Sequence, residues 1–335
     1  MTNLVISVEG IDGSGKTTLI NNLRNDIYFD LIVKNWRDTI NGKKIWYLLN
    51  STKGKEKEDF TPWSYILLFI TAFNELNNKV IRQNIEKKSV IIDRYIDSTL
   101  VYQGLLENIE VNNILRVAND VDLIFPNVTF ILDVEPLKAQ ERIKKRKIEI
   151  EQNKNWNDLN LNFQKKIRKN YLELKNFFPE RICVIDANKD EKEVAKEVKE
   201  TIKRIIYPEK ILPKFVRAVI YNKSGELLVV KDNKWGWNLP GGRIEPNETP
   251  EKAIKREVFE ETNLTLKNHK QLGVERTFFA NLGKDNDVWE GHFFKSNEYS
   301  GEVKIKEIGK ILDVKFVNIN FFSNFLPYHY LKWIK

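Results

Sequence analysis

A glycine-rich loop that follows an apolar run constrains the start of this chain more than any other feature. The segment Gly10-Ile-Asp-Gly-Ser-Gly-Lys16-Thr17 fits the pattern GxxxxGK(S/T), and the apolar run Leu4–Val8 precedes it. Glycines allow successive backbone N–H groups to point inward around a phosphate. Lys16 can then reach phosphate oxygens, and the Thr17 hydroxyl can bind Mg²⁺. A helical pattern follows, and a helix N-terminus adds positive charge. We therefore expect a nucleotide to bind at Gly10, Gly13, Ser14, Gly15, Lys16, Thr17 and Thr18.

Five short apolar runs alternate with helical patterns over the first 200 residues. Strands that are apolar on both faces and separated by helices indicate a parallel sheet covered on both sides. The amphipathic segment 190–206 is typical of a surface helix that closes such an α/β domain. The expected strands are Leu4–Val8, Phe29–Val33, Val90–Asp93, Val128–Asp133 and Ile182–Ile185.

The pattern changes after residue 207, where two prolines in Tyr207–Pro213 predict a linker over 208–213. Strand-like runs then flank Asn222–Gly225, a predicted hairpin turn, and one strong helix is expected at 250–262. These features indicate a second domain of α+β class over 214–335, separate from a first domain over 1–207. The strand-like segments are Phe215–Tyr221, Glu226–Val230, Trp289–Phe294 and Val314–Val317.

Composition narrows the setting and the partners. No apolar run approaches the roughly 20 residues of a membrane helix, and the N-terminus lacks the basic segment of a signal peptide. The single cysteine, Cys183, excludes a disulfide within the chain and fits a reducing, cytoplasmic setting. The net charge of +8 is compatible with attraction to polyanions such as nucleotides and equally with a lysine-rich composition. We expect nucleotide substrates, and neither a membrane nor a nucleic acid as partner.

An Asp-Arg pair ends the third expected strand, at Asp93 and Arg94. The carboxyl ends of parallel strands form the mouth of the sheet, where ligands bind, so Asp93 is expected to contact a metal or water and Arg94 to hold a phosphate. A nucleic-acid-dependent ATPase would usually end a strand in Asp-Glu. The strand ends here read Asp93-Arg94 and Asp133-Val134, which disfavours that class.

Four motifs together resemble the thymidylate kinase family over about residues 1–207. They are the EGIDGSGKTT loop, the run DRYIDSTLVYQG, Pro126–Val134 and Val184–Ala187. The resemblance implies a P-loop kinase fold with a five-stranded parallel sheet, ATP as phosphoryl donor and Mg²⁺ as cofactor. It is also compatible with a homodimer through this domain.

The resemblance also implies how a deoxynucleoside monophosphate acceptor would bind. Asp12 would bind its 3′-hydroxyl, and Arg37 and Arg94 its phosphate. Tyr102 would exclude a ribose 2′-hydroxyl, and Phe69 would stack on the base. Thr99 and Gln103 would lie near the base.

Two positions adapt this pattern. Gly13 stands where some members of the family carry an arginine, and members with glycine supply positive charge from a mobile lid. Because phosphoryl transfer needs cations around the γ-phosphate, Arg142 and Arg146 are expected as lid residues, with Arg146 nearer the transferred group, although a basic helix face in solvent would show the same charges. Phe73 stands where the family has an arginine that reads the thymine carbonyl. This replacement predicts relaxed base selection or a shifted base, such as a modified pyrimidine; the alternative is that Thr99 and Gln103 suffice to keep thymine. Phe73 itself is expected among the residues that bind the acceptor nucleotide.

Three glutamates far downstream, Glu257, Glu260 and Glu261, stand at i, i+3 and i+4 and share one helix face. Carboxylates so close repel unless cations intervene, and hard oxygen ligands suit Mg²⁺ or Mn²⁺. Such ions can clamp a diphosphate and activate water. Arg256 is expected to orient a glutamate by ion pairing, and Glu248 to be a further ligand or a support.

The spacing from Gly242 to Leu264 resembles the Nudix box, G-x5-E-x7-REUxEExGU, and implies the Gly242 carbonyl as a further metal ligand. Asn263 replaces the usual glycine, and asparagine is the next best residue for a left-handed cap. Trp237 matches the family's approach to the box, or packs in the core.

The sequence thus favours a bifunctional enzyme of nucleotide metabolism, with a dTMP-kinase-like first domain and a Nudix pyrophosphohydrolase second. The alternative is a kinase with altered base preference that is regulated by a non-catalytic, nucleotide-sensing Nudix module.

Overall fold

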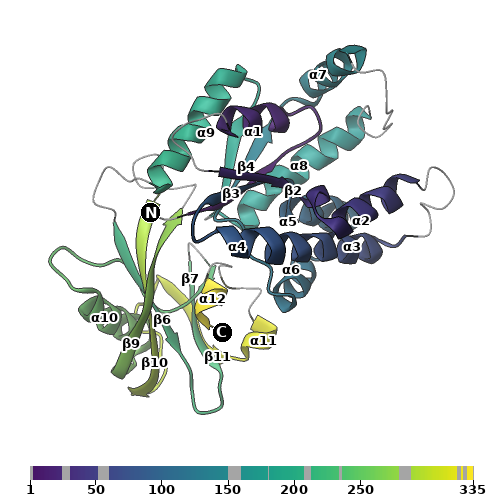
Figure 1. The fold of residues 1–335 in the computed structure, drawn as a ribbon. Helices are drawn as coiled ribbons and strands as arrows, with labels where there is room; N and C mark the ends of the chain where they lie inside the picture. The colour runs from purple at the N-terminus through teal and green to yellow at the C-terminus, as the bar shows by residue number, and fades with distance from the viewer. Residues whose placement is uncertain are drawn as a thin grey trace. The chain divides into compact units, whose positions relative to one another are not determined.

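The computed structural model describes residues 3–24, 31–51, 60–149, 160–179, 181–206, 213–233, 236–278, 288–322, 326 and 330–334. The chain divides into two compact units, Met1–Tyr207 and Pro208–Lys335, which Figure 1 shows in purple to teal and in green to yellow. All of the linker predicted over 208–213 except Pro213 lies outside the described residues, so that prediction stays a prediction.

The first unit is built on a five-stranded sheet in the order β2-β3-β1-β4-β5. Every neighbouring pair runs parallel, which confirms the predicted class of fold. The second strand ends two residues later than expected, because Lys34 and Asn35 still pair with Ile92 and Asp93. The strands are β1 (Val5–Glu9), β2 (Leu31–Asn35), β3 (Ser89–Asp93), β4 (Val128–Asp133) and β5 (Ile182–Asp186).

Helices flank this sheet (Figure 1). α1 and α9 contact each other, while α3, α5 and α8 contact the short helical segment η4 (Leu100–Gly104). Capping side chains fix two of the starts: Thr61 accepts from Ser64 N–H at α3, and Asn160 accepts from Phe163 N–H at α8. The helices are α1 (Lys16–Arg24), α2 (Ile40–Ser51), α3 (Pro62–Leu76), α4 (Arg82–Asn84), α5 (Ile96–Thr99), α6 (Val111–Asp120), α7 (Pro136–Glu149), α8 (Leu161–Phe177) and α9 (Glu191–Ile206), with η1 (Trp36–Asp38), η3 (Asn77–Ile81) and η5 (Leu105–Glu107) between them.

A buried ion pair joins the start of β5 to α5. The side chains of Asp97 and Arg181 are 0% and 5% exposed, and two N–H···O contacts of 2.7 and 2.8 Å connect them. Thr129 donates a further hydrogen bond of 2.7 Å to Asp97. Because charges so buried are costly without partners, this group fixes how α5 sits against β4 and β5.

The second unit holds two three-stranded sheets, β6-β10-β9 and β11-β7-β8. The predicted turn at Asn222–Gly225 is present, with Asn222 N–H bonded to the Glu226 carbonyl at 3.0 Å. The strands on either side do not form the expected hairpin, however. They pair only at Tyr221 and Leu227 and then enter different sheets. The strands are β6 (Lys214–Ile220), β7 (Leu227–Asp232), β8 (Gly236–Asn238), β9 (Thr265–Phe278), β10 (Val288–Ser300) and β11 (Ile311–Val317).

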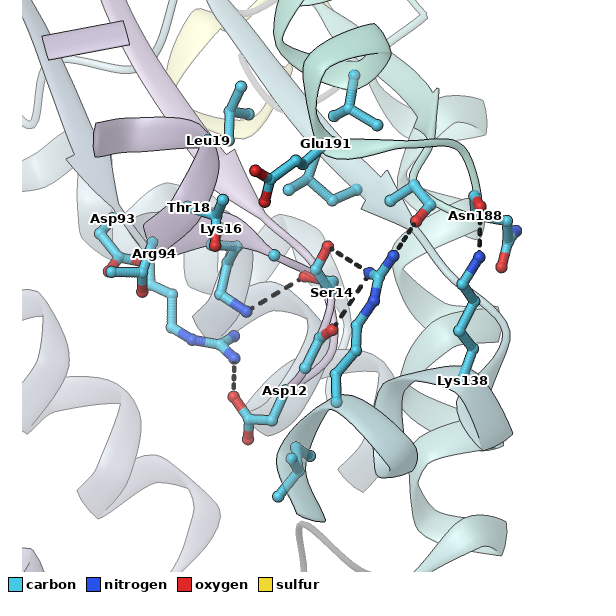
Figure 2. A pocket seen from close by; sticks show the side chains of 18 of the residues that line it. Asp12, Ser14, Lys16, Thr18, Leu19, Asp93, Arg94, Lys138, Asn188 and Glu191 are labelled. Carbon is cyan, nitrogen blue, oxygen red and sulfur yellow. Dashed lines mark hydrogen bonds and ion pairs between the residues drawn. The ribbon is translucent and has the colours of Figure 1, made fainter. Parts of the chain in front are cut away.

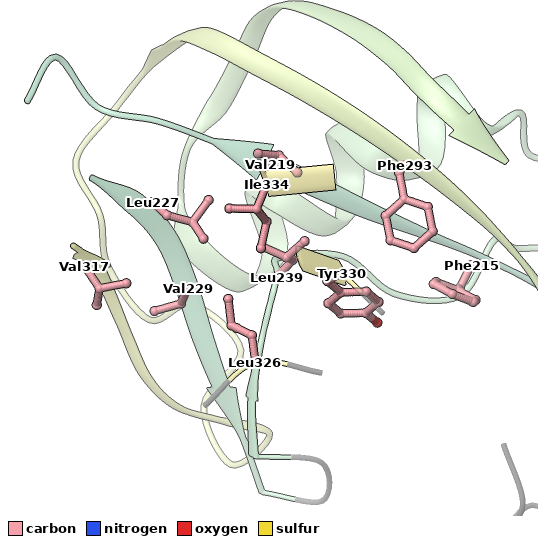
Figure 3. Packing of buried hydrophobic residues seen from close by; sticks show 10 residues of the cluster. All are labelled: Phe215, Val219, Leu227, Val229, Leu239, Phe293, Val317, Leu326, Tyr330 and Ile334. Atoms are coloured by element: carbon pink, nitrogen blue, oxygen red, sulfur yellow. The ribbon is translucent and has the colours of Figure 1, made fainter. Parts of the chain in front are cut away.

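Two apolar clusters hold the second unit together. One lies against α10 (Pro250–Thr262) and includes Val216, Val258 and Phe294. The other joins strands of both sheets to the C-terminal segment, which contains α11 (Ile319–Phe322) and α12 (Leu331–Ile334), as Figure 3 shows. The helix α10 therefore packs against the sheet that contains β6 and β9.

Among the described residues, no helix is long and apolar enough to span a bilayer.

Replacing Asp97 with alanine should strand the buried Arg181 guanidinium and cost about 3–5 kcal/mol of unfolding free energy. Urea unfolding of the full chain, followed by circular dichroism, measures this. The exposed pair of Lys196 and Glu200, whose charged atoms lie 3.9 Å apart, supplies the control. Glu200→Ala should cost less than about 1 kcal/mol, and equal losses in the two variants would contradict a structural role for the buried pair.

Candidate functional site

A cavity of about 950 Å³ opens where the strands of the parallel sheet end (Figure 2). The carboxyl ends of β1, β3, β4 and β5 lie along one edge because the strands run parallel. Residues of the glycine-rich loop, the β3 end, η1, α7 and the segment after β5 form its walls. They include Asp12, Gly13, Ser14, Gly15, Lys16, Thr17, Thr18, Arg37, Asp93, Arg94, Lys138, Arg142, Asn188 and Glu191.

The loop has the backbone that its glycines allow. Gly10, Gly13 and Gly15 have φ values of +138°, +83° and +98°. A Cβ on Gly13 would lie 2.4 Å from the Ala139 carbonyl oxygen, so α7 approaches the loop backbone too closely for a larger residue. The predicted loop is thus formed between β1 and α1.

Lys16 lies inside this loop. Its ammonium donates to the carbonyls of Gly10 at 3.0 Å and Ile11 at 2.9 Å. Burial, together with repulsion from Arg94, lowers the pKa of Lys16 to about 8. An anion at the loop would relieve both effects, which is the electrostatic condition for binding phosphate.

Arg94 lines the cavity and has a φ of +63°, which is rare for a residue with a side chain. Its guanidinium forms an ion pair of 2.5 Å with Asp12 and donates to the Tyr171 hydroxyl at 3.0 Å. It also lies over the Tyr102 ring, 5.7 Å from the ring centre. Strain of this kind collects at functional sites, and the structure brings together Asp12, Arg94 and Tyr102 as the sequence suggested.

A buried network behind Arg94 was missed at the sequence level. Glu9, at the end of β1, accepts hydrogen bonds from Tyr95 N–H at 2.7 Å, Ser98 Oγ at 2.6 Å and the Tyr171 hydroxyl at 3.1 Å. Burial raises the pKa of Glu9, with a further contribution from Asp97. The position of Glu9 at a strand end was a usable signal, whereas Tyr171 in α8 belonged to no motif.

The segment that carries Arg37, which is expected at the acceptor phosphate, reaches the same cavity. Arg37 lines it, and its Nε donates to Asn35 Oδ1 at 3.1 Å. Asn35 in turn donates to the Asp93 carbonyl at 3.0 Å, which ties η1 to the end of β3. Arg37 and Arg94 therefore lie on walls of one cavity.

The residues expected around the base differ in how far they are buried. Phe69 is half-buried and has its ring centre 5.2 Å from that of Trp36, edge to face. Gln103 and Tyr102 are also half-buried, whereas Thr99 is buried. None of these four residues is among the described residues that line the cavity.

Phe73 requires a correction. We expected it to contact the acceptor, but it is 1% exposed and lies in the core between Phe69 and Tyr95. An aromatic side chain gains more from this burial than from the water-facing position of an arginine.

Arg142 of α7 lies against the loop, as a lid residue should. It donates to the carbonyls of Ser14 at 3.4 Å and Ala187 at 3.0 Å. The side chain of Arg146 lies outside the described residues, so its role stays a prediction. Lys138 and Asn188, which share a hydrogen bond of 2.5 Å, were missed. They follow strand ends, and that position alone could have indicated them.

The second candidate site is the glutamate face of α10. Arg256 clamps Glu248 through two contacts of 2.9 and 2.8 Å, and its other nitrogen contacts Glu257 at 2.9 Å and Glu260 at 3.0 Å. The expected orienting role of Arg256 is thus matched by its contacts, and Glu248 lies in the position of a support. The left-handed cap predicted at Asn263 is confirmed, with φ at +62°.

Glu261 is the most buried of the box glutamates and has a partner that the sequence did not reveal. It accepts from Gly241 N–H at 2.9 Å. Arg217 of β6 donates to the Gly241 carbonyl and, at 3.0 Å, to the Tyr330 hydroxyl. Burial raises the pKa of Glu261 to about 7, although Arg217 opposes the rise. Arg217 lay on an ordinary strand pattern, so only the fold could connect it to the box.

Lys310, in the turn before β11, is a second unexpected cation. Its ammonium lies 3.8 Å from Glu261 and 2.8 Å from Glu307. Its pKa is raised because the three carboxylates of Glu307, Glu261 and Glu257 outweigh its partial burial.

The carboxylate oxygens of Glu257, Glu260 and Glu261 are donors of the kind that divalent ions bind. In this structure, however, no three acidic, histidine or cysteine side chains of the described residues converge as ligands. Arg256 forms ion pairs with both Glu257 and Glu260 and so fixes the positions of these two carboxylates. A Cβ on Gly242 would lie 2.3 Å from the Glu257 carboxylate, so the backbone at Gly242 reaches this carboxylate only as glycine. At Glu261 burial outweighs the nearby cations and raises the pKa, so a divalent ion beside it would stabilise the carboxylate. The ligand set of Gly242, Glu257, Glu260 and Glu261 stays a prediction, as does Thr17 in the first unit.

Trp237, before the box, is half-buried and packs edge to face on Phe322 with ring centres 4.9 Å apart. Lys315 lies over its ring at 4.5 Å. The contact with the C-terminal segment favours the packing role.

In the comparison with known proteins, a family model matches each of the two units. A thymidylate kinase family model matches residues 8–198, and a Nudix domain model matches residues 212–330. The thymidylate kinase of Mycoplasma capricolum subsp. capricolum is 37% identical over 194 residues, which cover 56% of this chain and 88% of that protein. The thymidylate kinase of Shouchella clausii is 34% identical over 61% of this chain and 96% of its own length.

Solved structures similar to the chain include the thymidylate kinase of Ehrlichia chaffeensis, at 26% identity and a TM-score of 0.47 over 61% of this chain and 99% of that one. A MutT Nudix hydrolase from Burkholderia pseudomallei aligns at 23% identity and a TM-score of 0.30, over 33% of this chain and 86% of that one.

Gly242→Ala should displace the Glu257 carboxylate and weaken Mn²⁺ binding by roughly tenfold or more, as loss of ligand positioning does at other metal sites. Isothermal titration with Mn²⁺ measures this. Gly225→Ala is the control, because no atom lies within 4 Å of the Cβ added there, although its φ of +76° strains an alanine. The same loss of Mn²⁺ affinity in both variants would contradict the local explanation.

Proposed function

We propose that this chain, which belongs to the thymidylate kinase family over residues 8–198 and carries a Nudix domain over residues 212–330, acts on two kinds of nucleotide. The first unit transfers the γ-phosphate of ATP to a deoxynucleoside monophosphate, dTMP or a related pyrimidine nucleotide. The second hydrolyses a nucleoside triphosphate or another nucleoside diphosphate derivative with the help of Mg²⁺ or Mn²⁺.

One observation carries the kinase assignment: a single cavity holds the glycine-rich loop and the two arginines expected at the acceptor phosphate. Lys16 and the loop amides form one part of its wall, and Arg37 and Arg94 form another. A donor and an acceptor phosphate bound at these two parts would face each other, which supplies the positioning that phosphoryl transfer depends on.

The other side chains of the cavity have separate roles in this proposal. Asp93 and the Thr17 hydroxyl line the cavity and would hold Mg²⁺, which neutralises charge on the ATP phosphates. Arg142 supplies positive charge beside the loop, and we assign the same role to Arg146. Arg94 now pairs with Asp12, and the acceptor phosphate would compete with Asp12 for this guanidinium. Asp12 would then accept a hydrogen bond from the 3′-hydroxyl.

The hydrolase assignment rests on the buried glutamates of α10 beside the Gly241-Gly242 turn. Glu257, Glu260, Glu261 and the Gly242 carbonyl would hold the divalent ions, which polarise a diphosphate and activate water. Arg256 and Glu248 keep the glutamates apart and oriented. The joining of both activities suggests a supply role, in which a monophosphate released by one unit feeds the other.

Removing the charge of one site should silence one activity and spare the other. Lys16→Met should lower phosphorylation by about 10²–10³-fold, as loss of one preorganised donor does, and leave hydrolysis unchanged. Glu260→Gln should lower hydrolysis by about 10²-fold or more and leave phosphorylation unchanged. A product-resolved screen of all dNMPs with Mg-ATP, and of all dNTPs, measures both.

Glu251→Gln, on the first turn of the same helix, is the control for Glu260. A wild-type protein that phosphorylates no dNMP would refute the kinase assignment. Nucleotide binding by the second unit without turnover would instead support a regulatory module.

The base should be selected mainly by shape. Because Phe73 replaces an arginine and is buried, discrimination between dTMP and 5-methyl-dCMP, which differ at position 4 of the base, should stay near the 10–200-fold that apolar pockets reach. The ratio of kcat/KM for the two nucleotides measures this. A ratio of about 10⁴ or more would reveal a polar group that reads the thymine carbonyl.

A further inference from the structure

The turn before β11 places a lysine at the edge of the glutamate face, from outside the Nudix box. Lys310 comes from the sheet that contains β7 and β11, whereas Glu261 belongs to α10. Its ammonium lies 3.8 Å from Glu261 and 2.8 Å from Glu307, and its side chain is 48% exposed. The cation is therefore close to a buried carboxylate and still open to solvent.

The backbone of this turn is firmly held. Asn233 donates from its N–H to the Lys310 carbonyl at 3.0 Å and from its side chain to the Gly309 carbonyl at 2.8 Å. Gly309 has a φ of +92°, which a glycine adopts without strain. The Cα of Lys310 is thus fixed while the four-carbon stem beyond it can move its ammonium.

The other cations near these glutamates each form several hydrogen bonds with the protein. Arg256 contacts three carboxylates, and Arg217 is held by the Gly241 carbonyl and the Tyr330 hydroxyl. Among the described residues, the Lys310 ammonium contacts only carboxylates: Glu307 closely and Glu261 at the longer distance. Of these three side chains, it is the one most able to exchange its partner.

The distance from the Lys310 ammonium to Glu261 indicates which group would replace Glu261 as its partner. Magnesium–oxygen bonds are about 2.1 Å long, so a phosphate oxygen that shares an ion with Glu261 lies within about 4 Å of that carboxylate. The Lys310 ammonium is already 3.8 Å from the same carboxylate. Both groups thus lie about 4 Å from one carboxylate, and rotation of the flexible stem can bring the ammonium to a phosphate oxygen bound on its side of Glu261.

We propose that Lys310 binds a phosphate oxygen of the diphosphate substrate in the second unit and leaves Glu261 as the divalent ions bind there. The inference rests on the proposed hydrolase function. It makes Lys310 a substrate-binding residue that the box does not contain.

The test uses the full chain, inorganic pyrophosphate as the ligand, and isothermal titration in the presence of Mg²⁺. Lys310→Met should weaken pyrophosphate binding by roughly tenfold, the usual scale for one charge-assisted hydrogen bond. Mn²⁺ binding without pyrophosphate should be unchanged or tighter, because a competing cation has been removed. Lys310→Arg, which keeps the charge, should bind pyrophosphate within about threefold of wild type.

Lys304→Met is the matched control, since Lys304 lies in the same loop and pairs with Glu302 at 2.8 Å in an exposed position. Equal pyrophosphate affinity in the Lys310→Met and Lys304→Met proteins would overturn the proposal. Weaker Mn²⁺ binding in Lys310→Met would also overturn it, because Lys310 would then support the glutamates instead of the substrate. If Lys310→Met fails to fold, Lys310→Gln takes its place and the same outcomes decide.

Failure of the hydrolase function is separately visible. A wild-type chain that binds Mn²⁺ and pyrophosphate but hydrolyses no nucleotide refutes the function and leaves the role of Lys310 to be decided by the binding data. A chain that hydrolyses nucleotides with a normal KM in Lys310→Met refutes the role of Lys310 alone.

Discussion

Burial of carboxylates imposes the main demand that both units of this protein satisfy. A carboxylate removed from water costs several kcal/mol unless donors or cations surround it. In the first unit, Asp97 is met by Arg181 and Thr129, and Glu9 by Ser98 and Tyr171. Each of these partnerships joins segments that are distant in sequence, so the positions of the helices around the sheet depend on them.

The two candidate sites resolve this demand in opposite ways. Glu9 receives hydrogen bonds from Ser7, Tyr95, Ser98 and Tyr171, and its role is to hold the backbone and hydroxyls that frame Arg94. Burial raises the pKa of both carboxylates, but Glu261 receives one hydrogen bond, from Gly241, and has the Lys310 ammonium 3.8 Å away. The first carboxylate is saturated by the protein, whereas the second can still gain from an added cation. This difference separates a scaffold from a metal-binding candidate.

The sequence predicted what depends on short-range pattern. The parallel sheet, the glycine-rich loop, the helix α10 and its cap at Asn263 all follow from local spacing. It did not predict contacts that the fold creates between distant strands. Lys310, in the turn before β11, lies 3.8 Å from Glu261, and Arg217 of β6 acts on Glu261 through its charge. Nothing near these two residues in the chain distinguishes them from other basic residues.

Phe73 and the turn at Asn222–Gly225 show a related limit. A family pattern placed Phe73 at the base, but an aromatic ring in an amphipathic helix is drawn into the core, and Tyr95 and Phe69 provide the contacts there. The turn was recognised correctly, yet its two strands separate into different sheets after one bridge. Local chemistry specifies a turn, while the packing of both strands decides what they pair with.

The cations around the box glutamates explain how such a site can fold before any ion binds. Arg256 contacts three of the glutamates, and Arg217, which is held by the Gly241 carbonyl and the Tyr330 hydroxyl, adds positive charge near Glu261. Complete compensation would leave no electrostatic gain for a divalent ion, and too little would leave buried like charges that repel each other. An exposed lysine on a fixed turn lies between these extremes, since it contributes positive charge while the site is empty of ligand and can transfer that charge to an incoming anion. A diphosphate carries the negative charge that such a transfer requires, and this is why the same side chain can serve the folded protein and its substrate in turn.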